Sequence, residues 1–130
     1  MTVNRLFDLF FKNIKKVGKS QFFRAKFYAT NYASKYDIDD RLMLFEAFSG
    51  DDFSGNTFYV FENIYNDKKF RVYKKVISVN KLSIPKVKAL LDNYGFKDNV
   101  KIVQKNSPAY CRALTTAKYL VNNVAFPTYF

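Results

Sequence analysis

The sequence predicts an α/β protein with a mainly parallel sheet preceded by amphipathic helices, and two observations support this. From Arg41 onward, short apolar or β-branched runs alternate with helical stretches, which is typical of successive βαβ units. Before that point, residues 1–36 hold eight Lys or Arg against one Asp, and an acidic break beginning at Asp37 separates the two regions. We therefore expect a basic amphipathic helical extension over residues 1–36 and an α/β domain over residues 37–130.

Composition indicates a folded, basic protein with one core. Of the 130 residues, 48% are apolar and 19% aromatic, which is ample for a core and unlike a disordered chain. The net charge of +11 favours polyanions or anionic membrane surfaces as partners. The absence of histidine excludes imidazole acid–base chemistry, and the single cysteine, Cys111, is expected to be a buried helical thiol. We expect neither a cofactor nor a metal site, and no apolar run is long enough to cross a bilayer.

Residues 3–19 form a strongly amphipathic pattern at helical spacing, with an apolar stripe opposite a row of basic side chains. Three interpretations stay open: the stripe packs on the α/β domain, lies in a membrane interface, or belongs to a nucleic-acid surface. No RNP-type or helix-turn-helix pattern supports the last, so nucleic acid is not an expected partner. A second helix is expected from Ser20 to about Tyr36. The membrane-binding candidates are Arg5, Phe7, Phe10, Lys12, Ile14, Lys15, Lys16 and Lys19.

The α/β domain is expected to alternate strands with helices whose starts carry Ser or Pro. Ser54 or Asn56 can cap the first of these helices, Pro85 suits the first turn of the second, and Gly95 ends it. The predicted strands are Leu42–Phe48, Phe70–Val79, Val100–Val103 and Val124–Phe126. The predicted helices are Thr57–Asn66, Ser83–Asn93 and Pro108 to about Asn122.

The loop after the first strand is the main candidate for ligand binding. In a doubly wound fold such a loop lies at the carboxyl end of a strand and beside a helix N-terminus, where free N–H groups favour anions. An ordinary strand-to-helix turn would explain the same residues, and Asp51 and Asp52 fit a solvated turn better than a metal or acid–base pair. The third helix start has the same geometry. The phosphate-binding candidates are Ser49, Gly50, Ser54, Asn56, Ser107 and Arg112, with Gly55 beside them.

Two stretches carry a resemblance to a known family. The first runs from Leu44 to Asn56 and is similar to a strand, a Ser-x-x-Gly turn and a downstream helix start, although Gly55 and Thr57 replace an Asp and a Pro of the family pattern. The second runs from Asn106 to Phe130 and includes an Ala-Lys-Tyr-Leu-x-Asn-Asn segment and Phe-Pro-x-Tyr-Phe. Residues 41–130 thereby resemble the N-terminal lobe of the CDP-glycerol:poly(glycerophosphate) glycerophosphotransferase family, which builds teichoic acid.

The resemblance implies a Rossmann-like, partial lobe of a two-lobed GT-B-type transferase. The donor CDP-glycerol would bind through a second lobe missing here, and the acceptor would be a lipid-linked teichoic acid. The family's Thr-Trp-His-Gly-Thr-Pro motif would follow shortly after Phe130, so we expect no catalytic residue in this chain and no activity from it alone.

A lipid-linked acceptor also favours the membrane interpretation of residues 3–19, with the protein cytoplasmic and peripheral on the inner face of the cell membrane. The alternative is a non-catalytic basic α/β module that binds membrane or nucleic acid.

Overall fold

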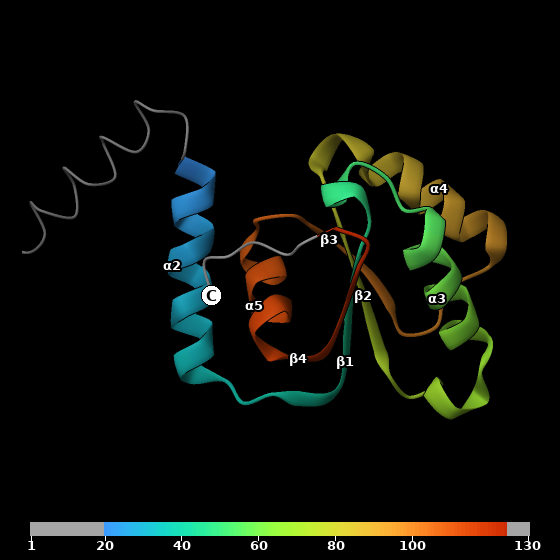
Figure 1. The fold of residues 1–130 in the computed structure, drawn as a ribbon, viewed down its shortest axis with the longest axis horizontal. Coiled ribbons are helices and arrows are strands. Elements are labelled where there is room, and N and C mark those ends of the chain that lie inside the picture. The colour runs from blue at the N-terminus through green and yellow to red at the C-terminus, as the bar shows by residue number, and fades with distance from the viewer. Residues whose placement is uncertain (1–19, 125–130) are drawn as a thin grey trace, which may run out of the picture.

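The structure, a computed structural model, describes residues 20–124, with the side chains of residues 20–25 and 29 left out (Figure 1). The predicted amphipathic segment 3–19, including every membrane-binding candidate, lies outside the described residues. The helices are α2 (Ser20–Lys35), α3 (Gly55–Asn66), α4 (Ile84–Tyr94) and α5 (Pro108–Thr116), and short 3-10 turns are η1 (Phe48–Gly50), η2 (Lys68–Phe70) and η3 (Lys81–Ser83). The strands are β1 (Asp39–Glu46), β2 (Lys74–Val79), β3 (Val100–Gln104) and β4 (Ala117–Asn122).

The four strands form one parallel sheet in the order β3-β2-β1-β4. The chain moves outward from β1 to β3 and then crosses back to place β4 on the other side of β1. The carboxyl ends of β1 and β4 therefore lie side by side at the point where the direction of winding reverses, which we call the switch point. The predicted α/β fold with a parallel, Rossmann-like sheet is confirmed.

Helices cover both faces of the sheet because its strands carry apolar side chains on both sides. On one face, Phe45 packs against Phe61 of α3 with ring centroids 5.2 Å apart and planes at 90°. On the other face, Leu44 joins a core cluster with Tyr110 and Leu114 of α5. Figure 1 shows α5 between the sheet and α2, with α3 and α4 on the opposite side. Partly buried tyrosines of α2 pack against the α5-side cluster, so α2 forms the outermost layer there.

The prediction of a helix from Pro108 to about Asn122 is wrong in its second half. Helix α5 ends at Thr116, and Ala117–Asn122 forms strand β4, paired with β1. The Thr116 hydroxyl donates to the Arg112 carbonyl at 2.6 Å in the last turn. Beyond it, residues with high β propensity, such as Tyr119 and Val121, pair with the edge of β1 that does not pair with β2.

Other boundaries shift by a few residues. The first strand begins at Asp39 and ends at Glu46 because η1 starts the following turn. The second begins only at Lys74, since η2 and the turn after it occupy the preceding residues. Of the strand predicted over residues 124–126, Val124 lies in a bend after β4 and the rest lies outside the described residues.

Several local predictions are confirmed. Gly95 ends α4 in the left-handed conformation with φ 70°, and a proline lies in the first turn of both α4 and α5. Cys111 is fully buried in α5, where burial raises the pKa of its thiol to about 11. None of the helices within residues 20–124 is long and apolar enough to cross a bilayer.

Candidate functional site

The switch point carries a buried carboxylate. Glu46, the last residue of β1, has 0% of its surface exposed. Its Oε1 accepts a hydrogen bond from the Ser78 hydroxyl on β2 at 2.9 Å, and its Oε2 accepts one from the Asn122 amide on β4 at 3.1 Å. Three neighbouring strands thus end on one polar cluster, held together by the charge of a single side chain.

Lys105 neutralises that carboxylate. It follows β3, its side chain is only 14% exposed, and its Nζ lies 3.6 Å from Glu46 Oε2. The same ammonium donates to the carbonyl of Ser49 at 3.0 Å. A largely buried charge persists only when it is paired and hydrogen-bonded, so this lysine is held firmly between the end of β3 and the loop after β1.

The loop after β1 has an unusual backbone. Phe48, Ser49 and Gly50 all have positive φ, at 49°, 56° and 93°. A Cβ on Gly50 would lie 3.0 Å from Asn80 Oδ1 and 3.1 Å from the Asn80 backbone nitrogen, which leaves no room for a side chain. Asn80 N–H donates to the Gly50 carbonyl at 2.8 Å, and its side-chain amide donates to Ser49 O and to the Asp51 carboxylate. The loop is therefore fixed in shape by its contact with the end of β2.

The start of α3 lies next to the switch point. Ser54 occupies the N-cap position, but its hydroxyl donates to Asp52 at 3.3 Å and forms no capping bond. A Cβ on Gly55 would lie 3.5 Å from the Phe48 ring and 4.0 Å from the Asn123 amide nitrogen, so the first turn of α3 approaches the end of β4. The Thr57 hydroxyl is buried there and has no hydrogen-bond partner among the described residues.

The two loop aspartates make separate contacts. Asp51 binds Asn80, whereas Asp52 accepts from Phe53 N–H at 2.8 Å and pairs with Lys86 at 3.3 Å. Burial alone would raise the pKa of Asp52, but these partners outweigh it and leave that pKa below its ordinary value. No group of three acidic, Cys or His side chains gathers around a common point within residues 20–124.

The structure brings most of the predicted phosphate-binding residues to one edge but separates one of them. Ser49, Gly50, Ser54 and Asn56 lie in or beside the loop after β1, and Ser107 begins α5 at the same edge of the sheet. The Ser107 hydroxyl accepts from Tyr110 N–H at 3.2 Å, which makes it a cap. The sixth candidate lies elsewhere, because the Arg112 guanidinium is stacked over the Tyr36 ring, 4.2 Å from its centroid.

Sequence reasoning missed the polar cluster itself, which comprises Glu46, Ser78, Lys105 and Asn122. A signal was available, since β1, β3 and β4 each end at a polar residue, Ser78 is next to last in β2, and Glu46 directly follows the apolar run 42–45. In a parallel sheet these ends meet at one edge. The edge carries the Lys105 ammonium and the uncapped N-terminus of α3, an arrangement that suits binding and orienting a phosphate-bearing ligand.

Comparisons with known proteins agree with this fold. The family model described as CDP-Glycerol:Poly(glycerophosphate) glycerophosphotransferase matches residues 26–130. No curated protein matches the chain by sequence. Among solved structures, a variant of the wall teichoic acid polymerase TagF soaked with CDPG for 15 minutes aligns with TM-score 0.60 at 18% identity, covering 99% of this chain and 30% of that one.

Two further TagF structures give the same result. A second variant aligns with TM-score 0.60 at 19% identity, and TagF itself with TM-score 0.59 at 20% identity; each alignment covers 99% of this chain and 28% of the other. The present chain thus spans less than a third of the solved chains it matches. At these identities the structural likeness concerns the fold, whereas the family match covers most of the sequence. The chain belongs to the CDP-glycerol:poly(glycerophosphate) glycerophosphotransferase family.

Proposed function

We propose that this chain is the acceptor-side lobe of a teichoic-acid glycerophosphotransferase. The whole protein would transfer glycerol phosphate, or a related polyol phosphate, from a CDP-linked donor to a lipid-linked polymer. Family membership supports the reaction class. The observation that supports this site is the polar cluster at the switch point, where Lys105 contacts Glu46 and the Ser49 carbonyl.

The reaction requires few groups from this lobe. A terminal glycerol hydroxyl of the acceptor attacks the β-phosphate of CDP-glycerol; a new phosphorus–oxygen bond forms, the bond to CMP breaks, and CMP leaves. The hydroxyl proton passes to a base, for which the family histidine outside this chain is the candidate. The residues present here bind and orient: the Lys105 ammonium, still paired with Glu46, donates toward a phosphate oxygen, and the first turn of α3, which has no side-chain cap, supplies N–H groups.

The reading frame of the source gene tests this proposal first. Downstream of Phe130 it is expected to encode a Trp-His-Gly motif and a second lobe. The complete product, incubated with a lipid-linked primer, is then expected to release CMP from CDP-glycerol and lengthen the primer. A stop codon directly after Phe130, or a complete product that releases no CMP from any CDP-polyol, would contradict the proposal and favour the non-catalytic basic module.

We also propose that residues 1–36 form a basic extension to the lobe of residues 37–130, and that residues 3–19 attach the protein to the inner face of the cell membrane. An apolar stripe beside a row of lysines gives two additive attachments to anionic lipid. Liposome sedimentation tests this with the intact chain and with a version lacking residues 1–19, which keeps α2 and its packing on α5. The intact chain should sediment with anionic vesicles only. Equal sedimentation of both forms, or indifference to anionic lipid, would argue against it.

A further inference from the structure

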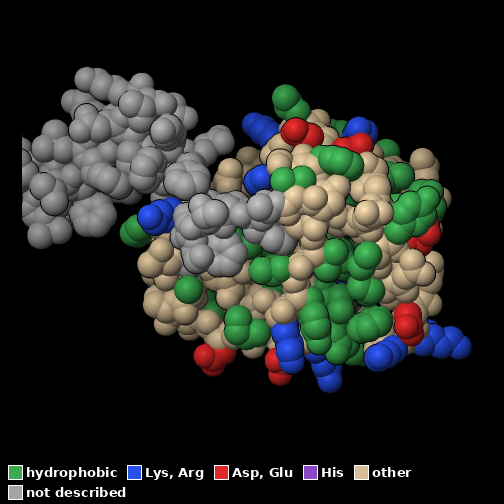
Figure 2. Space-filling model, in the orientation of Figure 1, with side chains coloured by type: hydrophobic (Ala, Val, Ile, Leu, Met, Phe, Trp, Pro, Cys, Tyr) green, Lys and Arg blue, Asp and Glu red, His purple; other side chains and the backbone are tan. Residues whose placement is uncertain are grey.

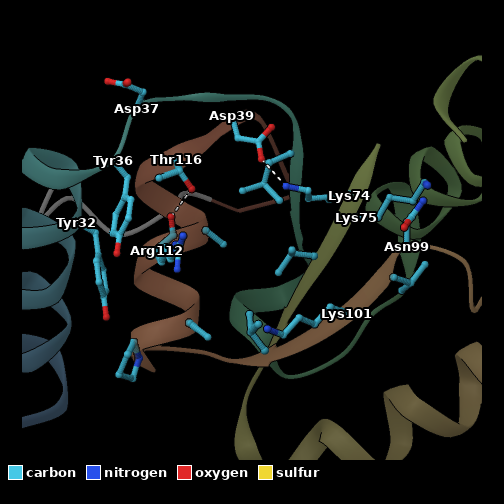
Figure 3. A pocket seen from close by; sticks show the side chains of 17 residues that line it. Tyr32, Tyr36, Asp37, Asp39, Lys74, Lys75, Asn99, Lys101, Arg112 and Thr116 are labelled. Atoms are coloured by element: carbon cyan, nitrogen blue, oxygen red, sulfur yellow. Dashed lines mark hydrogen bonds and ion pairs between the residues drawn. The ribbon is translucent and has the colours of Figure 1, made fainter. Parts of the chain in front are cut away.

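A cavity lies on the α5 face of the sheet, away from the switch point. It has a volume of about 720 Å³, within the range of roughly 300–1,000 Å³ that ligand pockets occupy. Its floor is formed where β2 and β3 extend beyond the cover of α5, and the end of α2 closes one side (Figure 3). The apolar residues that line the cavity include Val76 of β2 and Val103 of β3, with Leu42 of β1 and Ala113 of α5 beside them.

Two tyrosines of the α2 region form the wall opposite the sheet. The rings of Tyr32 and Tyr36 have centroids 5.9 Å apart and are tilted by 38°, and both line the cavity. Figure 3 shows both rings extending from α2 toward α5. The wall therefore presents aromatic faces and hydroxyl groups, a combination that suits a ligand with both carbon-bound hydrogens and polar groups.

Two cations reach this cavity without an acidic partner among the described residues. The Arg112 guanidinium is stacked on Tyr36 at 4.2 Å, an arrangement that leaves its in-plane N–H donors available. Lys101 extends from β3 toward α5 (Figure 3), and no ion pair within residues 20–124 involves it. The other lining lysines are occupied, since Lys74 pairs with Asp39 at 2.8 Å and Lys75 lies over the Tyr65 ring on the opposite face.

The acidic groups near the cavity do not cancel these charges. Asp39 is taken by Lys74 and by the Arg41 N–H at 3.0 Å. Asp37 lies at the rim and points away from Arg112 (Figure 3). In the view of Figure 2, charged side chains of both signs line the lower edge of the molecule, where β1 and β4 begin. Among the described residues, the cavity thus holds two cations, Arg112 and Lys101, without a carboxylate partner, while the ion pair at its rim involves neither of them.

We propose that this cavity binds a phosphodiester segment of a poly(glycerophosphate) chain, as a second contact separate from the switch point. The choice of polymer rests on the proposed function. A guanidinium fork pairs two oxygens of one phosphodiester, and a lysine across the cavity pairs the next charge along a repeating polyanion. The glycerol links between the phosphates contact the tyrosine wall and the apolar floor. A polymer bound at both places is held more tightly than by either alone.

The test is a titration of the ¹⁵N-labelled 130-residue chain with a synthetic phosphodiester-linked glycerol phosphate tetramer. Inorganic phosphate and an uncharged polyglycerol of equal length serve as control ligands. The tetramer should shift the resonances of Asn99, Lys101 and Arg112, and binding should weaken as salt is added. Arg112→Gln and Lys101→Gln should each weaken binding about fivefold, corresponding to about 1 kcal/mol for one charge-assisted contact. Both side chains are exposed, so both variants should stay folded and keep the well-dispersed spectrum of the wild type.

Lys88→Gln is the matched control, because it removes one exposed lysine from α4 on the opposite face. It should change affinity less than about twofold. Equal weakening by Lys88→Gln, or equally tight binding of inorganic phosphate, would overturn the proposal, as would shifts confined to Ser49 and Gly50. A different result would separate this site from the proposed function. If the complete wild-type protein transfers no glycerophosphate but the tetramer still binds in this cavity, the proposed function is contradicted and this site is not.

Discussion

Gly50 shows how one residue fixes the shape of the candidate site. Its φ of 93° lies in the region that side chains disfavour, and Asn80 occupies the space that a Cβ would need. Gly95 has a similar φ of 70°, but within residues 20–124 no atom beyond its chain neighbours and its own helix lies within 4 Å of the position that a Cβ would take there. Both glycines therefore adopt a positive φ that side chains disfavour, but only at Gly50 does another residue occupy the space of a Cβ.

Alanine at these two positions separates the two effects. Gly95→Ala should lower the free energy of unfolding by about 1 kcal/mol, the cost of the left-handed backbone. Gly50→Ala should cost about 1–2 kcal/mol more, because Asn80 must also move. Urea denaturation followed by circular dichroism measures both. Equal losses would mean that the contact with Asn80 does not hold the loop.

Lys75 is a second residue whose environment has a measurable consequence. It is 2% exposed, donates to the Tyr73 carbonyl at 3.0 Å and lies over the Tyr65 ring. Burial lowers its pKa from the ordinary lysine value of 10.5, with Asp98 opposing the change. Because the unfolded chain then holds this proton more tightly, the lysine lowers stability at neutral pH, and stability recovers as pH rises from the lowered pKa toward 10.5.

Lys75→Met should raise the free energy of unfolding at pH 7 by about 1 kcal/mol, since the charge no longer has to leave water. The gain over the wild type should shrink toward pH 10. Urea denaturation at both pH values measures this, with Lys88→Met as the exposed control. A loss of stability in Lys75→Met would show that the contacts with Tyr73 and Tyr65 outweigh the cost of burial.

Among the elements, α3 depends most clearly on one side chain. Phe61 is fully buried and packs edge-on against Phe45 and Phe53, with ring centroids 5.2 and 5.3 Å away. Phe61→Ala should lower the free energy of unfolding by about 3–5 kcal/mol through lost burial and the cavity left behind. Tyr59→Ala on the same helix, at a residue 63% exposed, should cost less than about 0.5 kcal/mol. Thermal denaturation of both variants checks the difference, and similar losses would contradict the packing described.

Elements with one clear periodicity were predictable, and β4 was not. The starts of α4 and α5 follow from Ser and Pro, and the apolar runs of β1, β2 and β3 are strand-like. After α5 the apolar residues Ala113, Leu114, Ala117, Leu120 and Val121 continue the spacing of a helix. What overrides that pattern is the open side of β1, a tertiary partner that local spacing does not contain.

At the scale of the whole molecule, the parallel sheet determines which part of the site was predictable. The position of the Ser49–Asn56 loop at the carboxyl edge follows from the rule for doubly wound sheets. The polar cluster depends on the register of three strands, which places Ser78 and Asn122 opposite Glu46. The sequence places Arg112 one turn into the helix that starts after Ser107 and makes it a candidate for an anion there, but its side chain turns toward Tyr36 of the next layer.

The central claim is that Lys105 at the switch point serves substrate binding beyond its pairing with Glu46. Lys105→Met alone would leave a buried carboxylate unpaired and destabilise the protein, so the informative variant is the double change Glu46→Gln with Lys105→Met, which removes both charges. Lys88→Met controls for loss of one surface charge.

The decisive measurement is the rate of glycerophosphate transfer from CDP-glycerol to a lipid-linked primer by the complete protein carrying these variants. We predict that the double variant keeps a near-normal melting temperature and loses about tenfold or more in kcat/KM, equivalent to about 1.4 kcal/mol of transition-state stabilisation. Lys88→Met should stay within about twofold of the wild type. A stable double variant with wild-type transfer would show that the cluster only holds the fold together and would contradict the claim.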